Sequence, residues 1–176
     1  MPRYADPMTT LILTVAGADR PGLVAAVADV VDAHGGNWEN SQLAELAGTF
    51  AGVIEVSVAA DRAAELENAL HELEGLLTVA VRAGADAAAA DPQQRLTIQV
   101  LGNDRPGIVR EVSAALSAHD LSIEDLTTTT RDAAMAGGRL FEATVVAKVP
   151  ASVDLETLQA DLERLAAEIQ VDVTLA

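Results

Sequence analysis

The sequence predicts an α+β protein of two similar units, each with an antiparallel four-stranded sheet and two helices on one face of that sheet. Two observations lead to this prediction. The chain of 176 residues repeats itself at an offset of 85 residues, and both copies alternate strand-like and helix-like hydrophobic patterns in the same order. The clearest part of the repeat is Ala18-Asp19-Arg20-Pro21-Gly22-Leu23-Val24, which recurs as Asn103-Asp104-Arg105-Pro106-Gly107-Ile108-Val109.

The first unit contains six expected elements. Residues 10–16 alternate apolar and polar side chains, as a half-buried strand does. Pro21 suits the first turn of a helix, and apolar residues follow at helical spacing until His34-Gly35-Gly36 ends that helix. The remaining elements are a hairpin of residues 38–46 and 50–58, a helix with Asp61 as its N-cap, and a strand of residues 77–81.

The second unit repeats this order. Its expected elements are residues 96–101, 107–118, 122–130, 140–149, 155–169 and 171–175. Its hairpin is six residues longer around positions 131–138, so that Phe141 matches Phe50 as a core residue. Met135, within this longer hairpin, is a candidate for a contact with a partner. The order strand, helix, strand, strand, helix, strand is that of the ferredoxin-like fold.

We expect four segments in the chain: a tail at residues 1–9, a first unit at 10–82, an exposed linker at 83–94 and a second unit at 95–176. The linker contains four consecutive alanines and Asp91-Pro92, without an amphipathic period. Units of this size lie near the lower limit for an independent core, so the two units are expected to share an extensive interface. Open sheet edges also favour a homodimer.

The composition excludes several classes of function. With 11 basic and 27 acidic residues the net charge is −16, and we expect no nucleic-acid binding because this field repels phosphates. The absence of cysteine excludes disulfides, thiolate metal sites and a cysteine nucleophile. No apolar run approaches the ~20 residues of a membrane span, and the first residues lack a signal-peptide core. We therefore expect a soluble, cytoplasmic protein.

The sequence offers no catalytic or metal-binding motif. It lacks HExxH, a glycine-rich phosphate loop and GxSxG. His34 and His119 occupy equivalent expected helix ends, where a histidine interacts favourably with terminal carbonyls. His71 lies on a charged helix and is expected to be exposed. We expect neither catalytic activity nor a metal or other cofactor.

Both units resemble ACT domains, over residues 10–81 and 96–175, and the tandem form with Asp-Arg-Pro-Gly in both turns is similar to the group of glycine cleavage system transcriptional repressors. The resemblance implies a regulatory module that binds a free amino acid such as glycine at an interface between ACT units. It also implies action on a protein partner, in this group a transcriptional activator. The implied ligand-binding residues are Asp19, Arg20, Pro21, Gly22 and Leu23 in the first turn, Asn103, Asp104, Arg105, Pro106, Gly107 and Ile108 in the second, and Asn37, Asn40, Ser122 and Asp125 at the starts of the second strands.

The physical chemistry of the repeated turn suits a zwitterion. Unpaired N–H groups at a helix start favour a carboxylate, and Asn103, Asp104 or Asp19 can accept a hydrogen bond from an ammonium group. A purely structural interpretation of the turn stays open. In that interpretation the two aspartates cap helices and the prolines start them, while Arg20 and Arg105 make ordinary surface ion pairs.

Two functions from different classes remain at this point. One is an amino-acid sensor whose ligand changes its affinity for a protein partner, and the other is a constitutive interaction module with a decayed ligand site. Because Ala18 stands in the first turn where Asn103 stands in the second, we expect the second turn to be the more competent site. A third option, a subunit detached from a larger enzyme, requires a catalytic partner.

Overall fold

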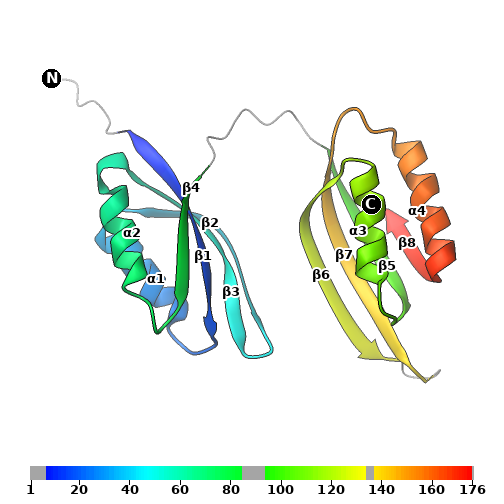
Figure 1. Ribbon diagram of the computed structural model, residues 1–176, viewed down its shortest axis with the longest axis horizontal. Helices are drawn as coiled ribbons and strands as arrows, with labels where there is room; N and C mark the ends of the chain where they lie inside the picture. The colour runs from blue at the N-terminus through cyan, green and yellow to red at the C-terminus, as the bar shows by residue number, and fades with distance from the viewer. Residues whose placement is uncertain (1–6, 85–93, 134–136, 176) are drawn as a thin grey trace. The chain divides into compact units, whose positions relative to one another are not determined.

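The structure is a computed structural model that describes residues 7–84, 94–133 and 137–175. The chain divides into two compact units, residues 1–88 and 89–176 (Figure 1). Parts of three segments discussed above lie outside the described residues: 1–6 of the tail, 85–93 of the linker, and 134–136 of the long hairpin, with Met135. Within the described part, β4 extends to Ala83 and β5 begins at Gln94, so both ends of the predicted linker are strand residues.

The first unit has the predicted order of elements. They are β1 (Met8–Ala18), α1 (Leu23–Ala33), β2 (Asn37–Leu46), β3 (Thr49–Ala59), the 3-10 helix η1 (Ala60–Arg62), α2 (Ala63–His71) and β4 (Thr78–Ala83). The sheet order is β2-β3-β1-β4, with all neighbours antiparallel. Between β2 and β3 a two-residue turn places Ala47 and Gly48 at φ 51° and 80°, as expected for a tight hairpin turn that twists with its strands.

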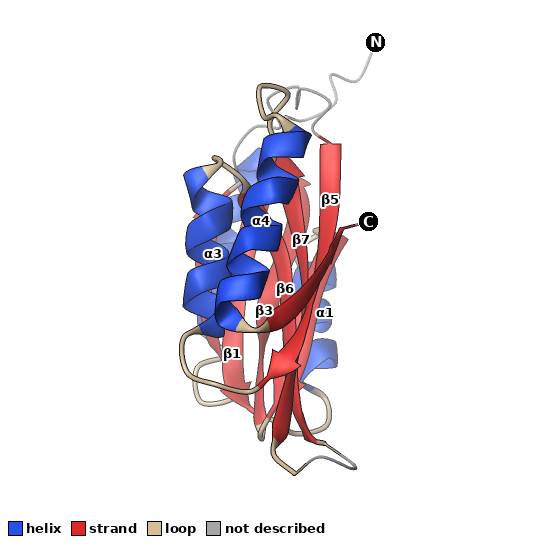
Figure 2. Cartoon of the chain, turned by 90° about the vertical axis from the view of Figure 1, so that its right-hand side faces the viewer, coloured by secondary structure: helices blue, strands red, loops and turns tan. Residues whose placement is uncertain are grey.

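The second unit repeats the same topology. Its elements are β5 (Gln94–Asn103), α3 (Ile108–Ala118), β6 (Ser122–Asp132), β7 (Arg139–Val149), α4 (Leu155–Ile169) and β8 (Val171–Leu175). The sheet order is β6-β7-β5-β8, and α3 and α4 lie together on one face of the sheet (Figure 2). The predicted α+β class with two ferredoxin-like units is confirmed.

Each unit buries its own aliphatic core between its sheet and its helices. Alternate residues of β1 and β5 point into these cores, and both helices of each unit add leucines or valines at helical spacing. The innermost residues include Leu13, Ile54, Leu66 and Leu70 in the first unit and Ile98, Leu116, Leu158 and Leu162 in the second. Phe141 is 7% exposed and belongs to the second core, as predicted. The opposite face of each sheet is not covered by the unit's own helices.

The predicted start of the second helix in the first unit is wrong. Asp61 lies inside η1, while Arg62 is the N-cap residue of α2 and makes no side-chain capping bond. The backbone N–H of Ala60 donates to the carbonyl of Pro7 at 2.8 Å, so a tertiary contact holds the chain where β3 ends. The chain then makes a tight 3-10 turn before the α-helix begins.

Candidate functional site

The repeated turn has the same backbone geometry in both units. Gly22 and Gly107 are the N-cap residues of α1 and α3, with φ of 92° and 97°. Side chains strongly disfavour this left-handed conformation, so glycine is required here for backbone reasons. A Cβ at Gly22 would meet no atom within 4 Å, which leaves open space in front of the first helix start.

The structural interpretation of the aspartates and prolines is therefore wrong in detail. Neither helix start receives a side-chain capping bond, and the N-cap position belongs to glycine rather than to Asp19 or Asp104. Pro21 and Pro106 precede the N-cap glycines instead of occupying the first helical turn. The left-handed glycine inserts one residue between the proline and the helix. The N–H groups at both helix starts are thus free of side-chain caps, and the positive end of the helix dipole faces outward.

Backbone hydrogen bonds hold each turn against the neighbouring hairpin. The N–H of Asp19 donates to the carbonyl of Gly48 at 2.9 Å, and the N–H of Asp104 donates to the carbonyl of Arg139 at 2.8 Å. These bonds tie the turn to the residue just before β3 in the first unit and to the first residue of β7 in the second, and they fix its orientation. Asn103 is the last residue of β5, exposed and paired in register with Leu140.

In the first unit, Arg20 lies beside an open pocket. Its Nη2 donates to the carbonyl of Gly75 at 3.0 Å, in the loop between α2 and β4. A pocket of about 360 Å³ is lined by residues of the end of β1, of the turn, of this loop and of β4. Its lining includes Gly17, Ala18 and Arg20 from the turn region. The backbone carbonyl satisfies only part of the guanidinium, which keeps further donors for an anion.

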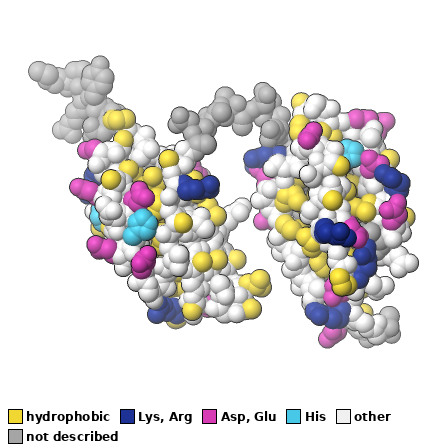
Figure 3. Space-filling view, in the orientation of Figure 1, with side chains coloured by type: hydrophobic (Ala, Val, Ile, Leu, Met, Phe, Trp, Pro, Cys, Tyr) yellow, Lys and Arg dark blue, Asp and Glu magenta, His cyan; other side chains and the backbone are white. Residues whose placement is uncertain are grey.

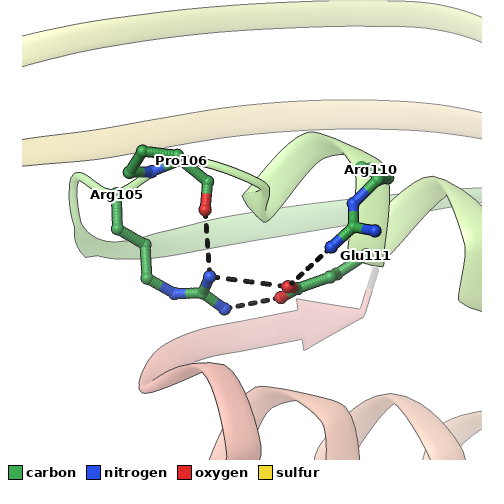
Figure 4. A network of polar contacts seen from close by, with 4 residues as sticks. All are labelled: Arg105, Pro106, Arg110 and Glu111. Carbon is green, nitrogen blue, oxygen red and sulfur yellow. Dashed lines mark hydrogen bonds and ion pairs between the residues drawn. The ribbon is translucent and has the colours of Figure 1, made fainter.

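In the second unit, Arg105 is held by a carboxylate of α3, the helix that follows the turn (Figure 4). Nη1 and Nη2 of Arg105 donate to the two carboxylate oxygens of Glu111 at 3.5 and 2.5 Å. Nη1 also donates to the carbonyl of Pro106 at 3.1 Å, and Arg110 approaches Glu111 to 3.6 Å. The expectation of a surface-paired arginine thus holds for Arg105. Glu111 is a residue of this site that the sequence analysis missed.

The starts of the second strands carry their own polar clusters. A β-bulge lies at Glu39 in β2 and at the matching Glu124 in β6. Asn37 donates to Glu39, and Asn40 donates to Glu55 on β3, both at 2.8 Å. A bulge re-aims a side chain, and here both bulged glutamates accept hydrogen bonds from the neighbouring strand, Glu39 from Ser57 and Glu124 from Lys148.

Within one unit these clusters and the turn lie at opposite ends of the sheet. Asn37 pairs with Ser57, which faces Thr10 near the start of β1, whereas the turn follows Ala18 at its end. Eight residues of strand correspond to roughly 27 Å. Asn40 instead joins a pocket of about 400 Å³ on the sheet face opposite the helices. A single unit does not bring the two predicted sets of ligand residues together, and the same holds for Ser122 and Asp125.

Comparison with known proteins decides the family. The model of the ACT domain matches residues 9–83 and again residues 94–175. This chain belongs to the ACT domain family. Each unit described above is one ACT unit, and the chain is a tandem ACT protein.

Individual relatives match most of the tandem ACT chain. It is 29% identical over 163 residues to the glycine cleavage system transcriptional repressor of Escherichia coli (strain K12), which covers 90% of this chain and 85% of that protein. A UPF0237 protein of Methanopyrus kandleri is 35% identical over 81 residues, 45% of this chain and 82% of that protein. The crystal structure of an unknown protein from Galdieria sulphuraria has a TM-score of 0.86 at 28% identity, with 96% of this chain and 98% of that chain covered.

Acidic side chains outnumber basic ones in the chain, and the two kinds are interspersed on its surface (Figure 3). Figure 3 shows acidic side chains interspersed with fewer basic ones on the face in view. Among the described residues, no cluster of three histidine, cysteine or acidic side chains could hold a metal ion. No helix within the same residues is long and apolar enough to cross a membrane.

The histidines occupy the positions that the sequence predicts, with one difference in partner. His34 and His119 are the C-cap residues of α1 and α3, and His71 is exposed. Nδ1 of His34 lies 2.8 Å from the carbonyl oxygen of Val30, as expected for a terminal carbonyl contact. Nε2 of His119 instead lies 2.9 Å from Oδ2 of Asp161 in α4.

We expect the second ACT unit to lose stability in acid before the first. Hydrogen bonds from Arg95 and Lys148 lower the pKa of Glu124, and a hydrogen bond from Arg105 lowers the pKa of Glu111. A carboxylate with a lowered folded-state pKa stabilises the folded state above its unfolded pKa, and this contribution is lost as the pH falls through the folded-state value. Among the described residues of the first unit, only Glu39 shows such a lowered pKa, from Ser57 and Asn37.

Thermal unfolding from neutral pH to below the ordinary glutamate pKa of 4.5 tests this expectation. Fluorescence of Trp38, the single tryptophan, follows the first unit, while circular dichroism follows both. As the pH falls, the melting temperature from circular dichroism should begin to drop at a higher pH than the melting temperature from fluorescence. Glu124→Gln should reduce this difference in pH. Two transitions that shift together in acid would contradict the expectation.

Proposed function

We propose that this tandem ACT protein is a non-catalytic sensor that binds a free amino acid at the turn between the first strand and first helix of an ACT unit. The observation that carries the proposal is the uncapped helix start behind the left-handed glycine, present in both units. Such a helix start offers N–H donors and a positive dipole end to a carboxylate. Arg20 or Arg105 adds a guanidinium, and Asp19, Asp104 or Asn103 adds an acceptor for the ammonium group.

The proposed output is contact with a protein partner. The relative from Escherichia coli is named a transcriptional repressor of the glycine cleavage system, which makes a transcriptional regulator of amino-acid metabolism the first partner class to test and glycine the first ligand. The net charge of −16 disfavours contact with DNA itself. We therefore expect the purified chain to retain no duplex DNA at physiological salt. Retention of a specific DNA sequence by the chain alone would contradict the proposal that it acts through a protein partner.

The proposal places the complete site at an interface between ACT units. Asn37 and Asn40, or Ser122 and Asp125, lie at the far end of the sheet from their own turn. These residues can join a turn only when they come from another unit or another subunit. We accordingly propose that the two units share an interface and that the chain forms a homodimer.

A second candidate function is a constitutive interaction module. The first turn lacks the amide of Asn103 and has Ala18 instead, and the arginine of the second turn is already paired with Glu111. A thermal-shift series with the proteinogenic amino acids separates the two functions. A ligand that binds only the folded state must raise the melting temperature by mass action, whereas the constitutive module shows no shift with any amino acid.

Asn103→Ala is expected to weaken amino-acid binding at the second turn by about 1 kcal/mol, the usual net contribution of one hydrogen bond. The reason is that its amide both donates and accepts, at the exposed end of β5 beside the helix start. Calorimetric titration of the full chain with glycine measures the change. Ala18→Asn, the matched substitution in the first turn, should strengthen binding there, and equal affinities in all three proteins would move the ligand away from this position.

A further inference from the structure

The two turns differ at one position that faces the arginine. Glu111 in the first turn of α3 corresponds to Ala26 in α1, at the same offset of 85 residues. Among the described residues, α1 has no acidic residue in its first turn, whereas α3 has Glu111. The repeat therefore contains an internal comparison: one turn with a resident carboxylate and one without.

The resident carboxylate occupies the place that an external carboxylate would need. Both oxygens of Glu111 accept from the guanidinium of Arg105, at 3.5 and 2.5 Å (Figure 4). A Cβ built on Gly107 would lie 3.4 Å from one of these oxygens, so the carboxylate lies beside the N-cap glycine itself. At Gly22 the corresponding space is empty to 4 Å.

The chemistry of this contact matches that of a bound amino acid. A guanidinium pairs with a carboxylate in two-point fashion whether the carboxylate belongs to a side chain or to a free molecule. A negative charge in the first helical turn also interacts favourably with the helix dipole and thereby weakens the attraction for a second anion. Hydrogen bonding to Arg105 lowers the pKa of Glu111, so this carboxylate is charged at neutral pH.

We propose that Glu111 is a built-in competitor of the second turn, which must leave Arg105 before a ligand carboxylate can bind there. The inference rests on the proposed function, because it concerns the same turn. The pair is displaceable, since Arg105 and Glu111 keep 38% and 26% of their side-chain surface exposed and exposed ion pairs are weak. Glu111 thus sets the affinity of the second turn, while the first turn stays open to anions.

The experiment follows the arginine side chains of the full chain by NMR, with acetate as the carboxylate probe and glycine as the amino-acid probe. In the wild type, the Nε resonance of Arg105 should change little with acetate. In Glu111→Ala and in the isosteric Glu111→Gln, acetate should shift this resonance with an affinity raised about fivefold, as expected when one exposed ion pair no longer competes. Glu163→Ala, which removes a charge elsewhere on the second unit, should behave as the wild type does.

The outcomes separate this inference from the proposed function. An acetate response of Arg105 that is equal in the wild type and both Glu111 variants would overturn the role of Glu111, whatever glycine does. A response to acetate in the variants, together with no binding of glycine or other amino acids to any form, would support the competitor and refute the amino-acid sensor. The resonance of Arg20, which bonds to Gly75, serves as the internal reference and should not depend on Glu111.

Discussion

Gly52→Ala is expected to lower the free energy of unfolding of the first ACT unit by about 3 kcal/mol, near the upper end for overpacking of a folded interior. Gly52 lies in β3 and pairs with Val15 of β1 and Leu43 of β2. A Cβ at this position would overlap the backbone carbonyl of Gln42 and would lie 2.8 Å from Cα of Leu43. The strand backbone cannot move away without losing its ladder hydrogen bonds. The substitution therefore lowers the free energy of unfolding of the whole unit.

Urea unfolding followed by Trp38 fluorescence measures this effect, because Trp38 packs against the core of the first unit. The midpoint should fall while the dependence on urea stays unchanged. The matched control is Ala143→Gly in the second unit, since Ala143 faces Val100 where Gly52 faces Val15; its unfolding is followed by circular dichroism, because Trp38 reports on the first unit alone. This control should cost only about 1 kcal/mol, the usual cost of glycine in a strand. A midpoint of Gly52→Ala equal to that of the wild type would contradict the close approach of β2 and β3.

Gly107→Val is expected to weaken amino-acid binding at the second turn by about tenfold or more, with a backbone strain of about 1–3 kcal/mol. Gly107 has φ of 97°, which a β-branched residue does not adopt without strain. The added side chain would also enter the space beside Glu111 and Arg105, whose nearest atoms lie 3.4 and 3.8 Å from the new Cβ. The helix start and the arginine should both lose their present arrangement.

Two further variants separate strain from loss of the site. Gly137→Val places valine at φ of 63° in open space of the same unit and reports the effect of strain away from the turn. Gly22→Val makes the matched change in the first turn, where φ is 92°. Calorimetry with glycine on folded variants decides the outcome: loss of binding only in Gly22→Val would assign the ligand to the first turn. Unchanged binding in both turn variants would move the site elsewhere.

Local patterns were sufficient to predict the elements of this fold. Period-two strands, period-3.6 helices and the turn residues recur in both copies, and the order of elements follows from them without knowledge of long-range contacts. The strand 171–175 and the helix 155–169 have the predicted bounds. The predicted end of the first helix at His34-Gly35-Gly36 is also confirmed: His34 is the C-cap residue of α1, and Gly35 has a φ of 69°. Such features depend on neighbours in the chain, which the sequence displays directly.

The sequence could place the candidate site only in part. It marks the repeated turn and both arginines as candidates, because they are duplicated. It did not identify Glu111 as the partner of Arg105, since the pairing depends on the direction of two side chains around a left-handed glycine. The signal was nevertheless present: Glu111 stands where the first repeat has Ala26, within one helical turn of the N-cap.

The sequence by itself determined the family, the two-unit order of elements and the position of the turn, because each depends on short-range pattern or on duplication. Only the tertiary structure decided that Gly22 and Gly107 begin the helices, and that Gly52 has no room for a side chain. It also decided that Asn37 lies at the far end of the sheet from its own turn. These properties depend on strand register and on backbone torsion, which bring distant residues together or keep them apart independently of their chemical type.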